Sequence, residues 1–146
     1  MTNDHEKYLV KNYPDIFVKA ITGKPFTKKE LNDGMTFGFE CDDGWFDLIK
    51  TLSNAIQEHV ENHNNWNSDN QLRIRAVQVK EKFGGLRFYI NGADDHVHGL
   101  INFAERLSFK ICQRCGSNVN VKRTDSSWIT YHCEKCRNEE SCSRES

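Results

Sequence analysis

Four cysteines near the C-terminus constrain the fold of this chain more than any other feature. Cys112 and Cys115 form one C-x₂-C pair, and Cys133 and Cys136 form a second pair after seventeen intervening residues. Two such pairs at this spacing supply the four thiolates of a tetrahedral Zn²⁺ site. The alternative is two disulfides, which require an oxidising compartment. Because four sulfur ligands leave no open position for water or substrate, we predict a structural zinc ion.

The composition of the chain narrows its class further. At 146 residues it has the length of about one domain. Twenty basic residues against twenty-one acidic ones give a net charge of −1, which disfavours a general nucleic-acid binder. The N-terminus does not resemble a signal peptide, and no apolar run approaches the length of a membrane span. We therefore expect a cytoplasmic protein that does not bind a membrane, with Cys41 as a small buried residue.

Hydrophobic periodicity in the first half of the chain predicts three elements. Residues 5–21 are expected to be helical with a break at the proline, and residues 35–41 to form a strand. Asp42 or Asp43 is then expected to cap an amphipathic helix, which a polar turn over 62–67 ends. The apolar stripe of this helix consists of Trp45, Leu48, Ile49, Leu52, Ile56 and Val60.

The second half of the chain predicts a hairpin and another helix. Strands over 72–80 and 86–90 flank a glycine turn at 83–85. Asp94 or Asp95 is expected to open a second amphipathic helix that leads directly to the first cysteine pair. Its apolar positions are Val97, Leu100, Ile101, Ala104, Leu107 and Ile111.

These elements predict an α+β fold with a small antiparallel sheet, two main amphipathic helices and a C-terminal zinc ribbon. We expect the α+β core to span residues 1–110 and the ribbon to follow without a break over 111–138. Between the cysteine pairs, 118–123 and 128–132 are expected to form the hairpin of the ribbon. Residues 139–146 are polar and charged, which predicts a disordered tail.

Two segments outside the cysteines are distinctive. They are Asp43-Gly44-Trp45-Phe46-Asp47-Leu48-Ile49 and the stretch from Ala76 to Tyr89, which contains Val79-Lys80-Glu81-Lys82-Phe83-Gly84-Gly85-Leu86-Arg87-Phe88-Tyr89. Both segments resemble a family of small proteins common in bacteriophage and prophage genomes. The family continues into a helix, a CxxCG knuckle and a tryptophan five residues before the third cysteine. Cys112, Cys115, Gly116, Trp128 and Cys133 match that pattern. The family often has histidine as the last ligand, whereas this chain has Cys136, and either residue suits a tetrahedral site. The resemblance covers about residues 35–136 and implies a phage-encoded accessory protein, without implying a biochemical activity.

No motif in the chain predicts a catalytic site. The turn at 83–85 lacks the lysine and hydroxyl residue of a Walker loop and is better explained as a hairpin turn. His59 and His63 share a helix face, but the residues between them match no zinc-protease signature. A metal-dependent nuclease or hydrolase built on Lys80, Glu81 and an aspartate is the least favoured alternative. We therefore assign no catalytic residue and favour a protein that is not an enzyme.

Basic and aromatic residues on and near the predicted ribbon are the candidate binding surface. The candidate partner-binding residues are Lys82, Arg87, Arg114, Lys122, Arg123, Trp128 and Lys135. Such residues neutralise phosphates and stack on bases, and they are equally typical of protein-interface hot spots. A third interpretation, in which Trp128 packs against the zinc loops, fits the sequence as well.

The leading hypothesis is an accessory protein that binds and modulates a host protein or a host protein–nucleic-acid complex. Host takeover and the blocking of host defence are the processes that a phage origin suggests. The near-neutral charge favours such a partner over free DNA. A nucleic-acid-binding zinc ribbon is the main alternative. The sequence determines neither the identity of the partner nor the oligomeric state.

Overall fold

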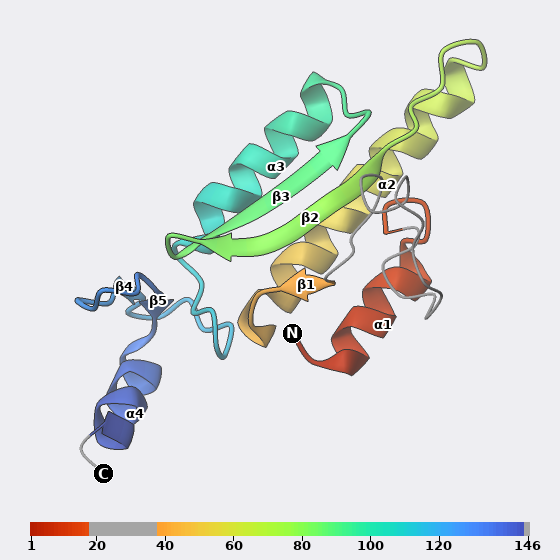
Figure 1. The fold of residues 1–146 in the computed structure, drawn as a ribbon. Helices are drawn as coiled ribbons and strands as arrows, with labels where there is room; N and C mark the ends of the chain where they lie inside the picture. The colour runs from red at the N-terminus through yellow and green to blue at the C-terminus, as the bar shows by residue number, and fades with distance from the viewer. Residues whose placement is uncertain (18–37, 145–146) are drawn as a thin grey trace.

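A computed structural model describes residues 1–17 and 38–144 of the chain. These residues form four α-helices, a three-stranded sheet and a two-stranded sheet (Figure 1). In chain order the elements are α1 (Asn3–Asn12), β1 (Phe39–Glu40), the short 3-10 helix η2 (Asp43–Trp45), α2 (Phe46–Trp66), β2 (Arg75–Lys82), β3 (Gly85–Asn91), α3 (Asp95–Ser108), β4 (Lys122–Arg123), β5 (Tyr131–His132) and α4 (Glu134–Arg144). The α+β class is confirmed. The predicted helical residues 18–21 and strand residues 35–37 lie outside the described part.

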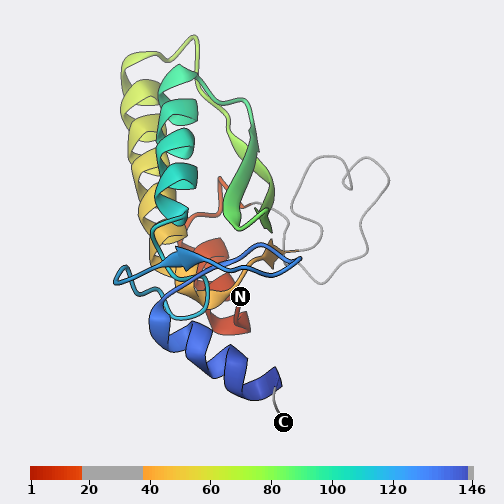
Figure 2. The same ribbon diagram turned by 90° about the vertical axis from the view of Figure 1, so that its left-hand side faces the viewer.

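The core has two layers, with α2 and α3 side by side on one face of the sheet β1-β2-β3 (Figure 2). β2 and β3 pair antiparallel, with Val79 opposite Phe88. β1 pairs parallel to β2, with Phe39 opposite Val79, so the prediction of a purely antiparallel sheet is wrong for this strand. The parallel pairing arises because α2 connects the two strands and returns the chain to the end where β1 began. All three of these side chains are buried.

Helix α2 forms because its apolar residues recur at helical spacing. The predicted stripe is buried throughout: Trp45, Leu48, Ile49, Leu52, Ile56 and Val60. The helix ends within the predicted stretch 62–67, but it continues to Trp66, so residues 62–66 are helical and do not form the predicted turn. Polar side chains of its last turns hold the returning loop instead. The Asn64 side chain accepts from the Leu72 N–H at 2.7 Å and donates to the Leu72 carbonyl at 3.0 Å.

Two aspartates at helix starts have different roles. Asp94 caps α3 as predicted, by accepting from the Val97 N–H at 3.0 Å, and its second oxygen lies 2.8 Å from His59 Nε2 on α2. Neither Asp42 nor Asp43 caps α2, contrary to the prediction: Trp45 holds its N-cap position, and the Asp42 side chain makes no capping bond to η2. The Asp43 carboxylate accepts from the Thr2 N–H at 2.7 Å and lies 2.9 Å from His5 Nδ1. The residue therefore fixes α1 against the start of α2.

Side chains of α1 and α3 accept hydrogen bonds from backbone N–H groups of the two outer strands of the sheet, β1 and β3. Glu6 of α1 accepts from the Phe39 N–H of β1 at 3.1 Å. On the opposite edge, Ser108 of α3 accepts from the Leu86 N–H at 2.9 Å, and Glu105 accepts from the Phe88 N–H at 3.0 Å. These amides are unavailable for pairing with a further strand, which is how edge strands are protected from association.

The C-terminal part differs from the prediction in its last residues. β4 and β5 pair antiparallel, which confirms a short hairpin between the cysteine pairs. The predicted disordered tail over 139–146 is wrong for residues 139–144, which continue α4.

Within the described residues, no helix combines the length and apolar character that crossing a bilayer requires.

Candidate metal centre and the adjoining cleft

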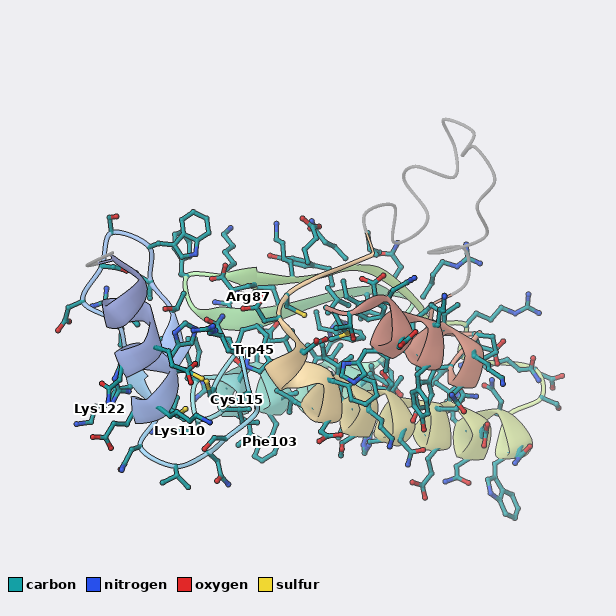
Figure 3. The ribbon with its side chains drawn as sticks, turned by 90° about the horizontal axis from the view of Figure 1, so that it is seen from below. Trp45, Arg87, Phe103, Lys110, Cys115 and Lys122 are labelled. Atoms are coloured by element: carbon teal, nitrogen blue, oxygen red, sulfur yellow. The ribbon has the colours of Figure 1, made fainter. Side chains whose placement is uncertain are left out.

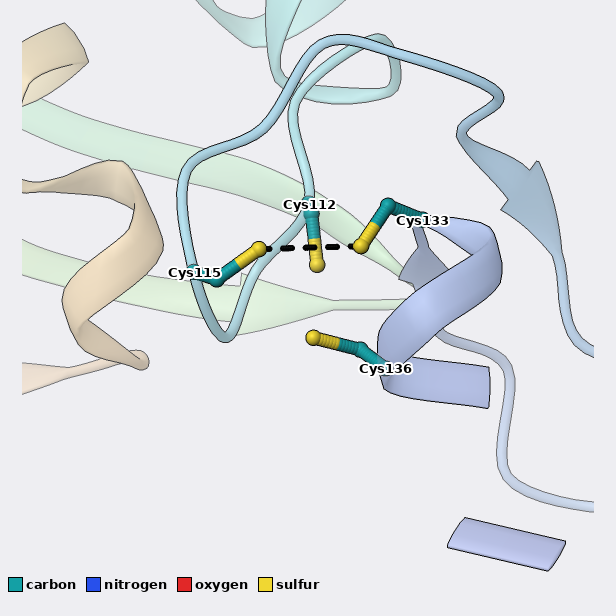
Figure 4. Close-up of side chains that lie close together, drawn as sticks. All are labelled: Cys112, Cys115, Cys133 and Cys136. Carbon is teal, nitrogen blue, oxygen red and sulfur yellow. Dashed lines mark hydrogen bonds between the residues drawn. The ribbon is translucent and has the colours of Figure 1, made fainter. Parts of the chain in front are cut away.

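The four predicted ligand cysteines converge at one point (Figure 4). Their sulfur atoms all lie within 4.8 Å of one another, and the Cys115 and Cys133 sulfurs are 3.6 Å apart. A disulfide bond would need about 2.05 Å, and all four thiols are free. Four sulfurs about 2.3 Å from a tetrahedral zinc ion lie about 3.8 Å from each other. The donor set and its spacing therefore fit a metal ion of this kind.

Two local structures present the sulfurs. The first knuckle closes through the Gly116 N–H, which donates to the Cys112 carbonyl at 2.9 Å while Gly116 adopts a φ of +77°. Glycine occupies this left-handed conformation without steric cost. The second pair follows β5, with Cys133 just before α4 and Cys136 in its first turn. The Arg137 N–H donates to the Cys133 carbonyl at 3.1 Å and continues that turn into the helix.

Burial and hydrogen bonding set the charge of the metal-free cluster. The backbone N–H of Cys136 lowers the pKa of Cys133 to about 7. Burial raises the pKa of Cys136, whose side chain is only 4% exposed. At neutral pH the cluster therefore holds at least one proton that an incoming metal ion must displace.

The start of α2 packs directly against the first knuckle. The Gly44 N–H donates to the Gln113 carbonyl at 2.8 Å, and the Trp45 indole N–H donates to the Ile111 carbonyl at 3.2 Å. A Cβ atom on Gly44 would lie 2.1 Å from the Cys112 carbonyl oxygen, so only glycine allows this approach. A Cβ atom on Gly116 of the same knuckle would lie 3.1 Å from the Gly44 carbonyl oxygen. Gly44 and Trp45 thus form a docking surface for residues 112–136, which we call the cysteine segment.

The β2–β3 turn packs against the other side of the cysteine segment. A Cβ atom on Gly84 would lie 2.7 Å from the Tyr131 ring, and one on Gly85 would lie 2.4 Å from Phe109. The Phe109 and Tyr131 rings meet edge to face with centroids 5.0 Å apart. The predicted glycine hairpin turn is confirmed, and both of its glycines lie close against these aromatic rings.

A cleft separates the tip of this turn from the loop that precedes β5. It has a volume of about 460 Å³ and is lined by Glu81, Lys82, Phe83, Ser127, Trp128 and Ile129. Two of the predicted partner-binding residues, Lys82 and Trp128, are therefore brought together. Trp128 is 73% exposed, so the interpretation in which it packs against the metal loops is wrong. Phe83, 68% exposed, is a lining residue that sequence reasoning missed.

The remaining predicted partner-binding residues lie elsewhere. Lys122 and Lys135 are exposed, as is Arg123, and Figure 3 shows Lys122 well away from Arg87. The Arg87 guanidinium donates to the Leu86 carbonyl at 2.7 Å and lies over Gly85. The Arg114 guanidinium donates to the Cys136 carbonyl at 3.4 Å. These two arginines support the turn and the second knuckle, and the seven residues do not form one patch.

Gln113 is a second residue whose role the sequence did not reveal. It is 4% exposed, although it is polar and lies between the two cysteines of the first knuckle. Its backbone N–H donates to the Tyr131 carbonyl at 3.2 Å, and its side-chain oxygen accepts from the Tyr131 N–H at 3.4 Å. Together with the bond from Gly44, these contacts join the first knuckle to β5 and to the core.

Other residues considered for catalysis have structural surroundings. Burial raises the pKa of Cys41 to about 12, which leaves a protonated and unreactive thiol. Lys80 and Glu81 are neighbours on β2, so their side chains point to opposite faces of the sheet. The Glu81 carboxylate accepts from the Gly84 N–H at 2.6 Å, which closes the hairpin turn. The two residues of the proposed hydrolase centre therefore do not face a common point.

Comparison of the chain with protein-family models, with curated proteins and with solved structures found no match.

Proposed function

We propose that this protein is a zinc-stabilised binding module that holds a protein partner in the cleft between the β2–β3 turn and the loop before β5. The observation that supports this proposal most directly is the conformation of Phe83. Its φ is +52°, in the left-handed region, and the residue is 68% exposed. Phe83 and Gly84 both have positive φ, as in the two-residue turns for which Asn-Gly is preferred.

An aromatic residue at this position is unfavourable for stability. The left-handed conformation costs a non-glycine residue about 1–2 kcal/mol. Burial of the ring does not offset this cost, because most of the ring remains in water. Strained residues of this kind persist where they serve function. The Trp128 ring on the other side of the cleft, also largely exposed, makes a pair of aromatic anchors of the type that dominates protein interfaces.

The role we propose for the metal is to hold one wall of this cleft. Ile129 and Trp128 belong to the cysteine segment, whereas Lys82 and Phe83 belong to the core. A zinc ion on the four sulfurs would cross-link the segment into a zinc ribbon and so fix the two walls at their distance. All four positions of the ion would be filled by cysteine, which gives it a structural role.

The proposed partner is a host protein or a host protein–nucleic-acid complex in the cytoplasm. The resemblance of residues 43–49 and 76–89 to a phage-associated family supports a host component. The net charge of −1 and the apolar cleft support contact with protein. The backbone amides Phe39, Leu86 and Phe88 are already bonded to helix side chains, which also favours the cleft over strand addition at the sheet edges.

Affinity purification from bacterial lysate with quantitative mass spectrometry tests this proposal. The zinc-loaded wild-type protein should retain a partner that Trp128→Ala loses. Trp66→Ala is the matched control, because Trp66 is 88% exposed and ends α2, and Figure 1 shows this end of α2 far from the β2–β3 turn. The proposal fails if no protein is enriched above background, or if Trp128→Ala retains the same proteins as the wild type.

A nucleic-acid-binding ribbon is the second candidate. It is favoured by the exposed Lys122 and Arg123 on β4, which belong to the same short segment as the exposed Trp128. Phosphate contacts make binding weaken steeply as salt increases. Fluorescence anisotropy with single- and double-stranded oligonucleotides over a salt series measures this slope. A Lys122→Ala/Arg123→Ala variant with the wild-type slope would exclude these residues as phosphate contacts.

A further inference from the structure

The cleft has a second, polar half that the proposed function does not use. Next to the apolar half lies a pocket of about 330 Å³ whose lining includes Glu40, Asp42, Gln113 and Thr130. Glu81 and Trp128 line both halves, so the two pockets share a boundary. The result is one groove that is apolar at the hairpin turn and polar beside β1.

The charges along the groove are unequal. Three carboxylates line it, those of Glu40, Asp42 and Glu81, against two ammonium groups: that of Lys82 at the apolar end and the N-terminal one of Met1, which donates to the Cys41 carbonyl. Lys82 Nζ lies 5.5 Å from the centre of the Phe83 ring, at the apolar end. Glu81 is bonded to the Gly84 N–H, and Glu40 accepts from the Gln78 side chain at 3.0 Å. No lysine or arginine in the described part of the chain forms an ion pair with any of the three carboxylates.

We propose that the groove binds an extended segment of a partner protein that carries one large apolar side chain and, close to it, a lysine or arginine. The apolar side chain lies between Phe83 and Trp128. The cation lies in the polar half, facing Glu40 and Asp42. It also contacts the Trp128 ring, since an exposed indole attracts a cation that approaches its face. This inference rests on the proposed function and specifies the chemistry of its partner.

The distance between side chains two residues apart in an extended peptide lets one segment place a side chain in each half of the groove. Residues two apart in an extended segment project to the same side and are separated by about 6.5 Å. The two halves of the groove meet at Glu81 and Trp128. We therefore expect the apolar and the basic residue of the partner to be separated by one residue, and an acidic residue at the basic position to be rejected by like charge.

Selection from a phage-displayed library of random short peptides on the zinc-loaded protein tests the inference. The expected consensus combines a large apolar residue with a lysine or arginine about two positions away. Individual synthetic peptides are then measured by fluorescence polarisation. Replacing the basic residue of the selected peptide by glutamate should remove binding, and replacing the apolar residue by serine should do the same.

Protein variants assign the binding to the groove. Trp128→Ala and Phe83→Asn should each weaken binding at least about tenfold. Phe83→Asn places the preferred turn residue before Gly84, so it should melt at or above the wild-type temperature, which separates loss of the ring from unfolding. Glu40→Gln and Asp42→Asn should each weaken binding several-fold and reduce its salt dependence. Asp69→Asn, an exposed acid in the loop after α2, is the matched control and should change nothing.

Several results would overturn the inference. They are an acidic consensus, no enriched peptide, or binding that Trp128→Ala leaves intact. Self-association in sedimentation experiments that Trp128→Ala abolishes would also overturn it, because a second copy of the chain would then occupy the groove. An acidic consensus together with a Trp128-dependent partner in lysate would reject only the basic segment and leave the proposed function standing.

Discussion

Substituting Gly44 by alanine tests whether the core and the cysteine segment are one structural unit. A methyl group at this position would lie 2.1 Å from the Cys112 carbonyl oxygen and 2.4 Å from the Gln113 carbonyl oxygen. Ordinary contact begins at 3.4 Å, so the first knuckle must move by roughly 1 Å. This movement breaks the 2.8 Å hydrogen bond from the Gly44 N–H to Gln113.

The expected loss of stability is the sum of the steric clash at Gly44 and the broken hydrogen bond. Overpacking of this kind costs about 1–3 kcal/mol, and loss of the hydrogen bond adds about 1 kcal/mol. We therefore expect Gly44→Ala to lower the free energy of unfolding by about 2–4 kcal/mol. For a chain of this length, that corresponds to a melting temperature lower by roughly 6–12 °C. The displaced knuckle should also weaken zinc binding, as measured by competition with a chromogenic chelator.

Gly99→Ala is the matched control for this experiment. Gly99 lies in α3, and a Cβ atom there would meet nothing within 4 Å. Alanine is a better helix former than glycine, so this variant should be more stable by about 0.5–1 kcal/mol. Removal of zinc should shrink the effect of Gly44→Ala, because the docked segment loosens. A Gly44→Ala protein with wild-type melting temperature and zinc affinity would refute the reasoning.

Three further predictions concern the metal centre and the sheet edge. Cys136→His should retain zinc, because imidazole also suits a tetrahedral site. Cys136→Ser should weaken zinc binding by more than the roughly 100-fold that is typical when a residue hydrogen-bonded to a metal ligand is lost. Equal zinc content of the two variants by atomic absorption would contradict this prediction. Zinc affinity should fall at least about tenfold for each unit of pH decrease through the neutral range. The reason is that zinc binding displaces the proton that burial retains on Cys136 and, below about pH 7, also the proton of Cys133. Chelator competition at pH 6 and pH 8 measures this dependence, and a pH-independent affinity would exclude it. Glu105→Ala should lower the free energy of unfolding, measured in urea, by about 1–3 kcal/mol, because the Phe88 N–H loses its acceptor. Glu105→Gln keeps an acceptor oxygen and should keep most of the stability. Equal losses in both variants would show that the hydrogen bond is unimportant.

The sequence by itself determined the features that depend on neighbouring residues. The buried stripe of α2, the cap of α3 by Asp94 and the β2–β3 hairpin follow from local periodicity, capping and turn chemistry. The convergence of four cysteines follows from ligand spacing, since each C-x₂-C pair is a local turn. These signals arise within a few residues, so no knowledge of the rest of the fold is needed to read them.

Only the tertiary structure decided what the distant contacts are. Gly44 and Gly84 have a steric role that is visible only when the cysteine segment lies against them. The same contact buries Gln113, a polar residue, while Trp128, a large aromatic residue, stays exposed. The physical reason is that burial and close approach belong to pairs of surfaces, and the partner surface of each of these residues lies dozens of residues away in the chain. The groove between Phe83 and Trp128 exists for the same reason.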